Sequence, residues 1–161
     1  MKKQTHQFSY IIYGGIEELG DMDRLLLQQA RELTSVSYAP YSRFHVASVA
    51  QLANGEIIKG TNQENASFPV GICAERSLLA TAGVMFPNEI IETMAISYLP
   101  EEGKSNHPIS PCGMCRQALV EYESRVQHPI RMILSGMEGP VYLIQTAKDL
   151  LPLAFDSENL Q

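Results

Sequence analysis

The chain has 161 residues with 18 acidic and 12 basic side chains, a formal net charge of −6. This length suits one domain, and 45% hydrophobic against 19% charged residues is typical of a globular protein. The acidic balance argues against nucleic acid as a partner, because a phosphate binder needs a basic surface. No apolar run approaches the roughly 18 residues of a membrane span. Polar residues follow Met1-Lys2-Lys3, so we expect no signal peptide, no membrane association and a cytoplasmic location.

Predicted helices and strands alternate along the chain. Residues 1–20 hold an apolar stretch, 8–13, that indicates either an extra strand or an extended N-terminal arm. An amphipathic pattern predicts a helix over 21–37, with Asp21 as a possible N-cap. The Asn54-Gly55 pair then predicts a hairpin turn between two strands. These hairpin strands cover 44–52 and 56–60.

The second half of the chain continues this alternation. It predicts a helix at 72–86, a strand at 90–99, a helix at 112–124, and strands at 130–135 and 141–145. Five strands alternating with helices indicate an α/β fold in which helices cover both faces of one sheet.

The three cysteines lie in two unusual runs, Cys73-Ala-Glu-Arg and Pro111-Cys-Gly-Met-Cys-Arg-Gln. Cys112 and Cys115 are three apart at a predicted helix start, so they share one face and could bind one tetrahedral metal. Cys73 begins the preceding predicted helix, and a helix N-terminus favours thiolate over thiol. If the two helix N-termini converge, three thiolates would hold one zinc ion and leave an open position, which is typical of catalytic zinc.

Other interpretations of the cysteines stay open on this evidence alone. They could be small buried hydrophobic residues, a redox pair or half of a structural zinc site. A structural site would need a fourth ligand, and none of the four histidines stands in a paired-ligand context. His107, just before Pro108, comes closest, although an exposed loop histidine is the simpler interpretation.

Two charged residues beside Cys73 make a catalytic zinc site a more specific interpretation of the cysteines. Glu75 could move a proton between a metal-activated water and a substrate, provided that Cys73 precedes the regular helix, because residues two apart do not face each other. Arg76 could offset the net negative charge of zinc with three thiolates. The alternatives are a first-turn glutamate that stabilises the helix dipole and an arginine in a surface ion pair. Arg116 could share either role of Arg76.

Together these runs match the zinc deaminase signature in its variant with cysteine in place of the first histidine. From about Asp21 to its C-terminus the chain resembles the small homotetrameric cytidine deaminases. The matching segments are 38–44, 62–66, 71–76, 111–117 and 150–155. The resemblance implies a three-layer α/β/α fold with a mixed five-stranded sheet, in which 21–161 form a single catalytic domain.

The resemblance also implies an activity and a cofactor. One Zn²⁺ per chain would be held by Cys73, Cys112 and Cys115, with Glu75 as the proton-transfer residue. The reaction would be hydrolytic deamination of cytidine, deoxycytidine or both to the uracil nucleoside and ammonia, in pyrimidine salvage. The small-molecule partner would be the nucleoside substrate, and the protein would assemble as a homotetramer with active sites shared between subunits.

Substrate contacts follow from the same resemblance. Phe44 would pack against the pyrimidine ring, and Asn62 and Glu64 would hydrogen-bond the ribose 3′-hydroxyl. The backbone at Ala74 would orient the base, and Phe155 would reach the site of a neighbouring subunit. Without the resemblance, Phe44 could be an ordinary core aromatic and Phe155 could pack in the tail. Loop solvation and an Asx turn would then be the favoured interpretation of Asn62 and Glu64.

The chain departs from the family pattern at two places, and two alternative functions remain open. Phe68 stands where tyrosine is common, and Val46-Ala47-Ser48 replaces a more usual Val-Gly-Ala. The nearest rival is a deaminase of a nucleoside analogue such as a blasticidin-type antibiotic, against which Asn62 and Glu64 favour an ordinary nucleoside. A non-catalytic, zinc-stabilised binding module is the other, and Glu75 argues against it because a structural site needs no adjacent carboxylate.

Overall fold

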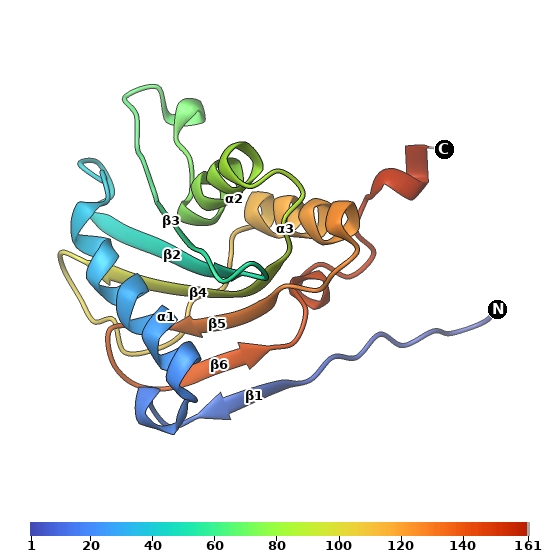
Figure 1. Ribbon diagram of the computed structural model, residues 1–161, viewed down its shortest axis with the longest axis horizontal. Coiled ribbons are helices and arrows are strands. Elements are labelled where there is room, and N and C mark those ends of the chain that lie inside the picture. The colour runs from blue at the N-terminus through green and yellow to red at the C-terminus, as the bar shows by residue number, and fades with distance from the viewer. Residues whose placement is uncertain (161) are drawn as a thin grey trace.

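The computed structural model describes residues 1–160 and has three layers, with one sheet between helices on its two faces (Figure 1). The strands are β1 (Tyr10–Tyr13), β2 (Phe44–Leu52), β3 (Ile57–Thr61), β4 (Ile91–Pro100), β5 (Arg131–Ser135) and β6 (Val141–Ile144). The helices are α1 (Asp21–Leu33), α2 (Ala74–Met85) and α3 (Gly113–Val126). Short 3-10 turns lie at Ile16–Glu18, Thr34–Val36, Phe68–Val70, Ala147–Leu150 and Ser157–Leu160.

The sheet is mixed and has the strand order β1-β6-β5-β4-β2-β3. Strands β4 and β5 pair in parallel, while the other neighbours pair antiparallel. The α/β/α architecture expected from the sequence is confirmed, but the sheet has six strands rather than five. The added strand is β1, whose Tyr10 and Tyr13 lie opposite Ile144 and Val141 of β6. Its backbone pairing to an otherwise open sheet edge makes this short segment a strand.

The two faces of the sheet carry separate cores. Along β4, Met94 and Ile96 face α2 and α3, whereas Ala95 faces α1, as the two-residue period of a strand requires. Because helices cover both faces, central strands are apolar without strict alternation. Helix α1 contributes Leu26, Leu27 and Ala30 to its own side.

Several element boundaries differ from those predicted. Gly20, not Asp21, is the N-cap of α1, and no side chain caps that end. The Asn54-Gly55 turn is confirmed: Gly55 has a φ of 88°, and the Asn54 side-chain oxygen accepts a hydrogen bond from the Glu56 amide at 2.9 Å. Within residues 1–160, no helix combines the length and apolarity that crossing a membrane requires.

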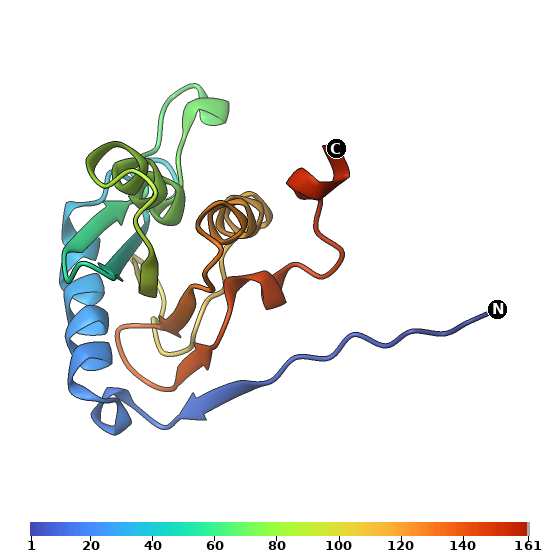
Figure 2. The same cartoon turned by 45° about the vertical axis from the view of Figure 1, so that its right-hand side comes forward.

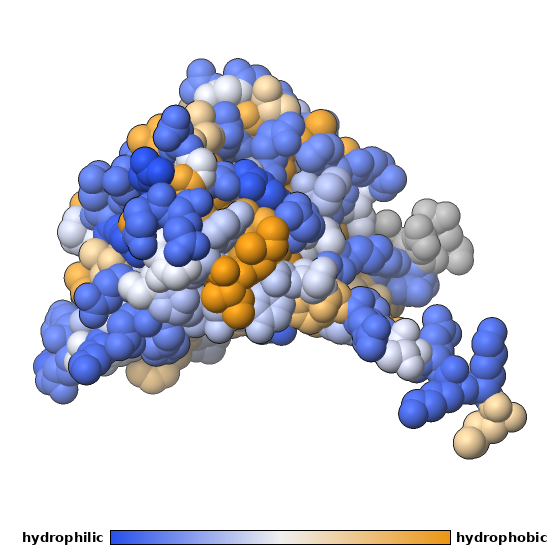
Figure 3. Space-filling model, turned by 90° about the horizontal axis from the view of Figure 1, so that it is seen from below, coloured by the Kyte–Doolittle hydropathy of each residue, from blue (hydrophilic) through white to orange (hydrophobic). Residues whose placement is uncertain are grey.

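The N-terminal residues extend away from the body of the molecule (Figure 2). Phe8 of this arm and Tyr10, Ile11 and Ile12 of β1 have exposed side chains. The molecular surface on this side, seen from below, is mostly hydrophilic and is interrupted by a small hydrophobic area (Figure 3).

Helices α2 and α3 lie side by side on one face of the sheet (Figure 1). Each begins directly after a cysteine in extended conformation: Cys73 is the N-cap of α2, with φ −75° and ψ 157°, and Cys112 is the N-cap of α3, with φ −67° and ψ 169°. The two helix starts therefore present their cysteines from neighbouring elements, although 39 residues separate them in the sequence.

Candidate metal centre and active site

The three cysteine sulfurs form one compact cluster. The Sγ atoms of Cys73 and Cys112 are 3.7 Å apart, those of Cys112 and Cys115 are 3.4 Å apart, and all three lie within 4.8 Å of one another. Zinc–sulfur bonds of ~2.3 Å in a tetrahedral site imply sulfur separations of about 3.8 Å. The cluster fits one zinc ion with small adjustments, which confirms the convergence of helix N-termini expected from the sequence.

The electrostatics of the cluster also suit a cation. Hydrogen bonding from the Cys115 thiol lowers the pKa of Cys73 to about 6, with a further contribution from Cys112 and a smaller one from the positive charge of Arg76. The same contact with Cys73 raises the pKa of Cys115. A negatively charged sulfur is thus favoured at Cys73, at the N-terminus of α2, where a bound cation would neutralise it.

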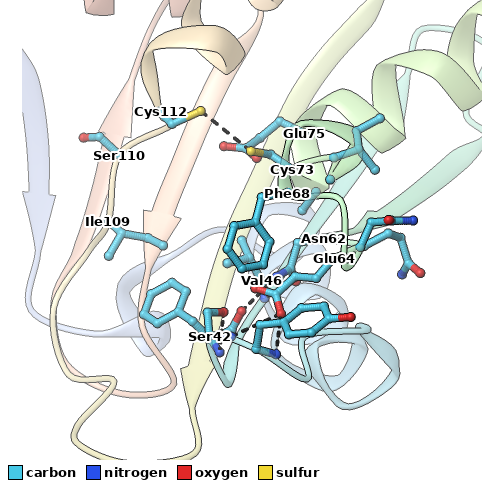
Figure 4. Close-up of a pocket in the computed structure, with 17 residues that line it drawn as sticks. Ser42, Val46, Asn62, Glu64, Phe68, Cys73, Glu75, Ile109, Ser110 and Cys112 are labelled. Atoms are coloured by element: carbon cyan, nitrogen blue, oxygen red, sulfur yellow. Dashed lines mark hydrogen bonds between the residues drawn. The ribbon is translucent and has the colours of Figure 1, made fainter.

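Glu75 lies beside this cluster. Because Cys73 is an N-cap, it precedes the regular helix, which removes the geometric objection to residues two apart acting together. The Glu75 side chain is only 4% exposed and points toward the sulfurs of Cys73 and Cys112 (Figure 4). Burial raises the pKa of Glu75, opposed by hydrogen bonds from its own backbone amide and the Cys115 thiol. A carboxyl group with a raised pKa is suited to proton exchange near neutral pH.

Two residues of the hairpin hold the first turn of α2 in place. A Cβ atom at Gly60 would lie 2.5 Å from the Ala74 oxygen and 2.5 Å from the Leu78 nitrogen, so only glycine permits this close approach. On the adjacent strand, the buried Ser48 hydroxyl donates a hydrogen bond to the Ala74 carbonyl at 2.8 Å. Sequence analysis gave the Val46-Ala47-Ser48 departure no role. A polar residue within an otherwise apolar strand is the signal that could have indicated this contact.

A cavity of about 760 Å³ opens in front of the cluster. Cys73, Cys112 and Glu75 lie at one end, and Ser42 lies at the other (Figure 4). Ala74, Phe44, Asn62 and Glu64, which were also predicted to contact substrate, line the cavity as well. Its volume falls in the range of small-molecule sites, about 300–1,000 Å³.

The side chains of Asn62 and Glu64 both form hydrogen bonds to the backbone around the cavity. Asn62 accepts a hydrogen bond from the Val46 amide and donates one to the Phe44 carbonyl, each at 2.8 Å. One Glu64 oxygen accepts from the amides of Tyr41 and Ser42 at 2.8 and 3.2 Å. The Ser42 hydroxyl and these two amides lower the pKa of Glu64. Both side chains keep capacity for a further partner, which a sugar hydroxyl could use.

The cavity has an aromatic and apolar lining. Phe68 contacts Tyr41 edge-to-face, with ring centroids 5.7 Å apart, and both side chains are exposed at the rim. Ile109 and Ser110 form the side opposite Asn62 (Figure 4). Sequence analysis did not single out Ile109 and Ser110, since nothing in a proline-containing loop marks which side chains face a cavity.

The remaining predicted residues lie outside the cavity lining. Arg76 is half-buried and acts on Cys73 through its charge, while Arg116 is anchored to backbone oxygens of Pro111 and Leu150, both at 2.8 Å. Arg116 thus fixes the segment entering Cys112 and does not share the role of Arg76. Phe155 is exposed, and its carbonyl accepts a hydrogen bond from the Gln117 side chain at 2.7 Å.

Comparison with known proteins identifies the family of this arrangement. Residues 21–128 match the model of the cytidine and deoxycytidylate deaminase zinc-binding region. All three cysteines and Glu75 fall inside the matched segment.

Individual relatives agree with the family match. The chain is 33% identical over 140 residues to a cytidine deaminase from Halalkalibacterium halodurans, covering 86% of this chain and 98% of the relative. The crystal structure of cytidine deaminase from Burkholderia pseudomallei superposes with a TM-score of 0.70 at 34% identity, covering 81% of this chain and 97% of that one. A blasticidin-S deaminase from Bacillus cereus is 27% identical over 139 residues, 85% of this chain and 94% of the relative.

Proposed function

Since the chain belongs to the cytidine and deoxycytidylate deaminase family and carries its zinc-binding region, we propose that it deaminates free cytidine and deoxycytidine in pyrimidine salvage. The observation that carries the assignment is the junction of two features in one cavity: a three-cysteine cluster and a buried carboxyl group. A binding module would have no use for Glu75 at that point. Residues 21–161 form the catalytic domain in this proposal.

The three cysteines would hold one zinc ion. When bound by Cys73, Cys112 and Cys115, zinc supplies a Lewis acid that makes water a competent nucleophile near neutral pH. Among residues 1–160, these three cysteines form the group of potential metal ligands that lies close enough to share an ion. Because three protein ligands fill three of four tetrahedral positions, a zinc ion held there would have one position open for reactants.

Glu75 is the proton carrier. It accepts a proton from the attacking water and delivers it to N3 of the cytosine ring, while the water oxygen bonds to C4. Glu75 then assists proton transfer to the amino group, the C4–N bond breaks, and ammonia leaves with the uracil nucleoside. Its burial between the sulfurs and the cavity supports this role, because a general acid–base group must reach the reacting atoms and exchange protons readily.

The cavity would seat the nucleoside with its base toward the cysteines and its sugar toward Asn62 and Glu64. Phe44 packs against the pyrimidine, and the Ala74 backbone orients it. The unused hydrogen-bonding capacity of Asn62 and Glu64 receives the 3′-hydroxyl. A 3′-hydroxyl contact accepts ribose and deoxyribose alike, so both nucleosides belong to the proposal.

Shared sites in a homotetramer are the last part of the proposal. Phe155 lies outside its own cavity and is exposed, at the end of a tail that Gln117 holds against α3. Leu153 and Phe68 are also exposed apolar side chains. Closure by neighbouring subunits would cover these groups and exclude water from the reaction.

Ammonia release tests the activity directly. Zinc-loaded protein is incubated with cytidine, deoxycytidine, cytosine and blasticidin S, with and without a chelator. Ammonia and the uracil nucleoside should form in equal amounts from the first two substrates, and chelation should abolish both. Blasticidin S is included because one relative is a blasticidin-S deaminase. Release from blasticidin S alone would refute the nucleoside assignment, and no release from any substrate would refute deamination.

A further inference from the structure

Tyr98 lies directly behind the cavity wall that Phe44 forms. In the antiparallel β2–β4 pair, Tyr98 is opposite Val46, which makes it the diagonal neighbour of Phe44. The two rings stack with centroids 5.1 Å apart and planes 20° apart. The Tyr98 side chain does not line the cavity, and the residue is only 2% exposed. The Tyr98 ring therefore packs against Phe44 without itself facing the cavity.

The other end of Tyr98 reaches the loop between β4 and α3. Its hydroxyl is within hydrogen-bonding distance of the His107 ring, 3.2 Å from Nδ1 and 3.4 Å from Nε2. The His107 ring meets Tyr98 edge-on, with centroids 5.7 Å apart. Two and three residues later, Ile109 and Ser110 form the opposite side of the cavity.

The same loop is anchored a second time at Tyr98. The buried Ser105 hydroxyl donates a hydrogen bond to the Tyr98 carbonyl and accepts one from the Met137 amide at 2.8 Å. Glycine is required at 136, where a Cβ atom would lie 2.3 Å from the Ser105 oxygen. The Ser105 hydroxyl thus ties this loop to the backbone of Tyr98 and Met137, and the His107–Tyr98 contact positions the following part, which lines the cavity.

We propose that Tyr98 and His107 are positioning residues that set the separation of the two cavity walls between which the pyrimidine ring lies. Phe44 is held from behind by the Tyr98 ring, and the Ile109–Ser110 wall is held through the hydroxyl of the same side chain. The proposal rests on the proposed function for the identity of the planar ligand. It assigns both residues an effect on binding and none on the proton transfers.

The test removes the hydroxyl and keeps the ring. In Tyr98→Phe the stack on Phe44 persists, but the His107 loop loses its partner. We expect KM for cytidine to rise about three- to tenfold, the change that loss of one net hydrogen bond produces, with kcat and zinc content unchanged. His107→Leu should give the same rise, and His107→Gln, whose side-chain amide can donate or accept a hydrogen bond, should restore part of it. In the double variant Tyr98→Phe/His107→Leu, KM should not rise beyond that of either single variant.

Tyr122→Phe is the matched control. Tyr122 is also a buried tyrosine, 4% exposed, and its hydroxyl donates to the Glu89 carbonyl at 2.7 Å, away from the cavity lining. This change should lower stability and leave KM unchanged. An unchanged KM in Tyr98→Phe, equal KM rises in Tyr98→Phe and the control, or additive effects in the double variant would each overturn the proposal.

Nucleoside binding separates this proposal from the proposed function. If the zinc-loaded wild type releases no ammonia, deamination fails, and the dissociation constant for cytidine replaces KM. A weaker complex in Tyr98→Phe than in wild type supports the positioning role even then. An equal dissociation constant overturns it, as does the absence of cytidine binding to the wild type.

Discussion

Replacing Glu123 by alanine should destabilise the protein strongly, because this buried carboxylate joins three segments. It accepts hydrogen bonds from the amides of Ile130, Ala147 and Lys148 at 2.7, 2.8 and 3.0 Å, and from the Thr146 hydroxyl at 3.0 Å. The contacts fasten the last turn of α3 to the start of β5 and to the 3-10 turn that leads into the C-terminal tail.

The loss of stability depends on which of the N–H groups bound to Glu123 remain inaccessible to water after the substitution. Ile130 is fully buried, so alanine at 123 leaves its N–H group without an acceptor, at about 1–3 kcal/mol. The buried Ala147 amide loses the carboxylate but keeps a second acceptor, the Ile130 carbonyl at 3.0 Å. Lys148 is exposed, so its amide can form a hydrogen bond to water instead. Removing a buried charge returns part of this cost. We therefore expect a loss of about 1–3 kcal/mol in the free energy of unfolding for Glu123→Ala.

Urea unfolding of the zinc-saturated protein measures this loss. Glu123→Gln keeps one acceptor oxygen and should lose about half as much. Glu121→Ala, an exposed change on the same helix, is the matched control and should stay within about 0.5 kcal/mol of wild type. A loss no larger than that of the control would contradict the reasoning, since water would then have replaced the carboxylate at the buried Ile130 amide.

Four further changes probe the site itself. Cys112→Ala should abolish stoichiometric zinc binding, measured by elemental analysis, and lower the melting temperature, because metal binding is coupled to folding; full activity without metal would contradict this. Glu75→Gln should keep zinc while turnover falls roughly 10²–10⁴-fold, and near-normal turnover would reduce Glu75 to a helix-start residue. Arg76→Gln removes a charge that lowers the pKa of Cys73. The alkylation of metal-free Cys73 and the rising limb of the pH–rate profile should therefore both move to higher pH, and unchanged curves would remove the charge-compensation role. Phe155→Ala should raise KM and weaken assembly with zinc retained, and a fully active monomer in light scattering would exclude a shared site.

The metal centre was predictable because its signals are local. The cysteine spacing in 112–115 and the placement of Cys73 at a helix start depend only on short segments of chain, and the structure bears both out. Element types were also predicted correctly where apolar periodicity was strong, as in α1 and β2. The N-cap of α1 was predicted wrongly, because acidic residues are common both as caps and in the first turn.

Contacts between distant segments were not predictable in the same way. Ser48 looked like an unexplained departure until β2 met α2, where its hydroxyl reaches the Ala74 carbonyl. Tyr98 and His107 had no sequence signal as a pair, and the contact of Tyr98 with Phe44 exists only because β4 pairs with β2. Strand β1 likewise became a strand only by pairing with β6.

The sequence by itself therefore determined the chemistry of this protein: thiol ligands, an adjacent carboxyl group and the helix starts that carry them. Tertiary structure alone decided how wide the cavity is, which side chains line it and which buried groups hold its walls. The physical reason is the distance along the chain over which each interaction acts. Helix starts and metal-ligand spacing depend on backbone geometry over a few residues, whereas the cavity depends on strand pairing and on side chains that meet only after the sheet and helices have packed.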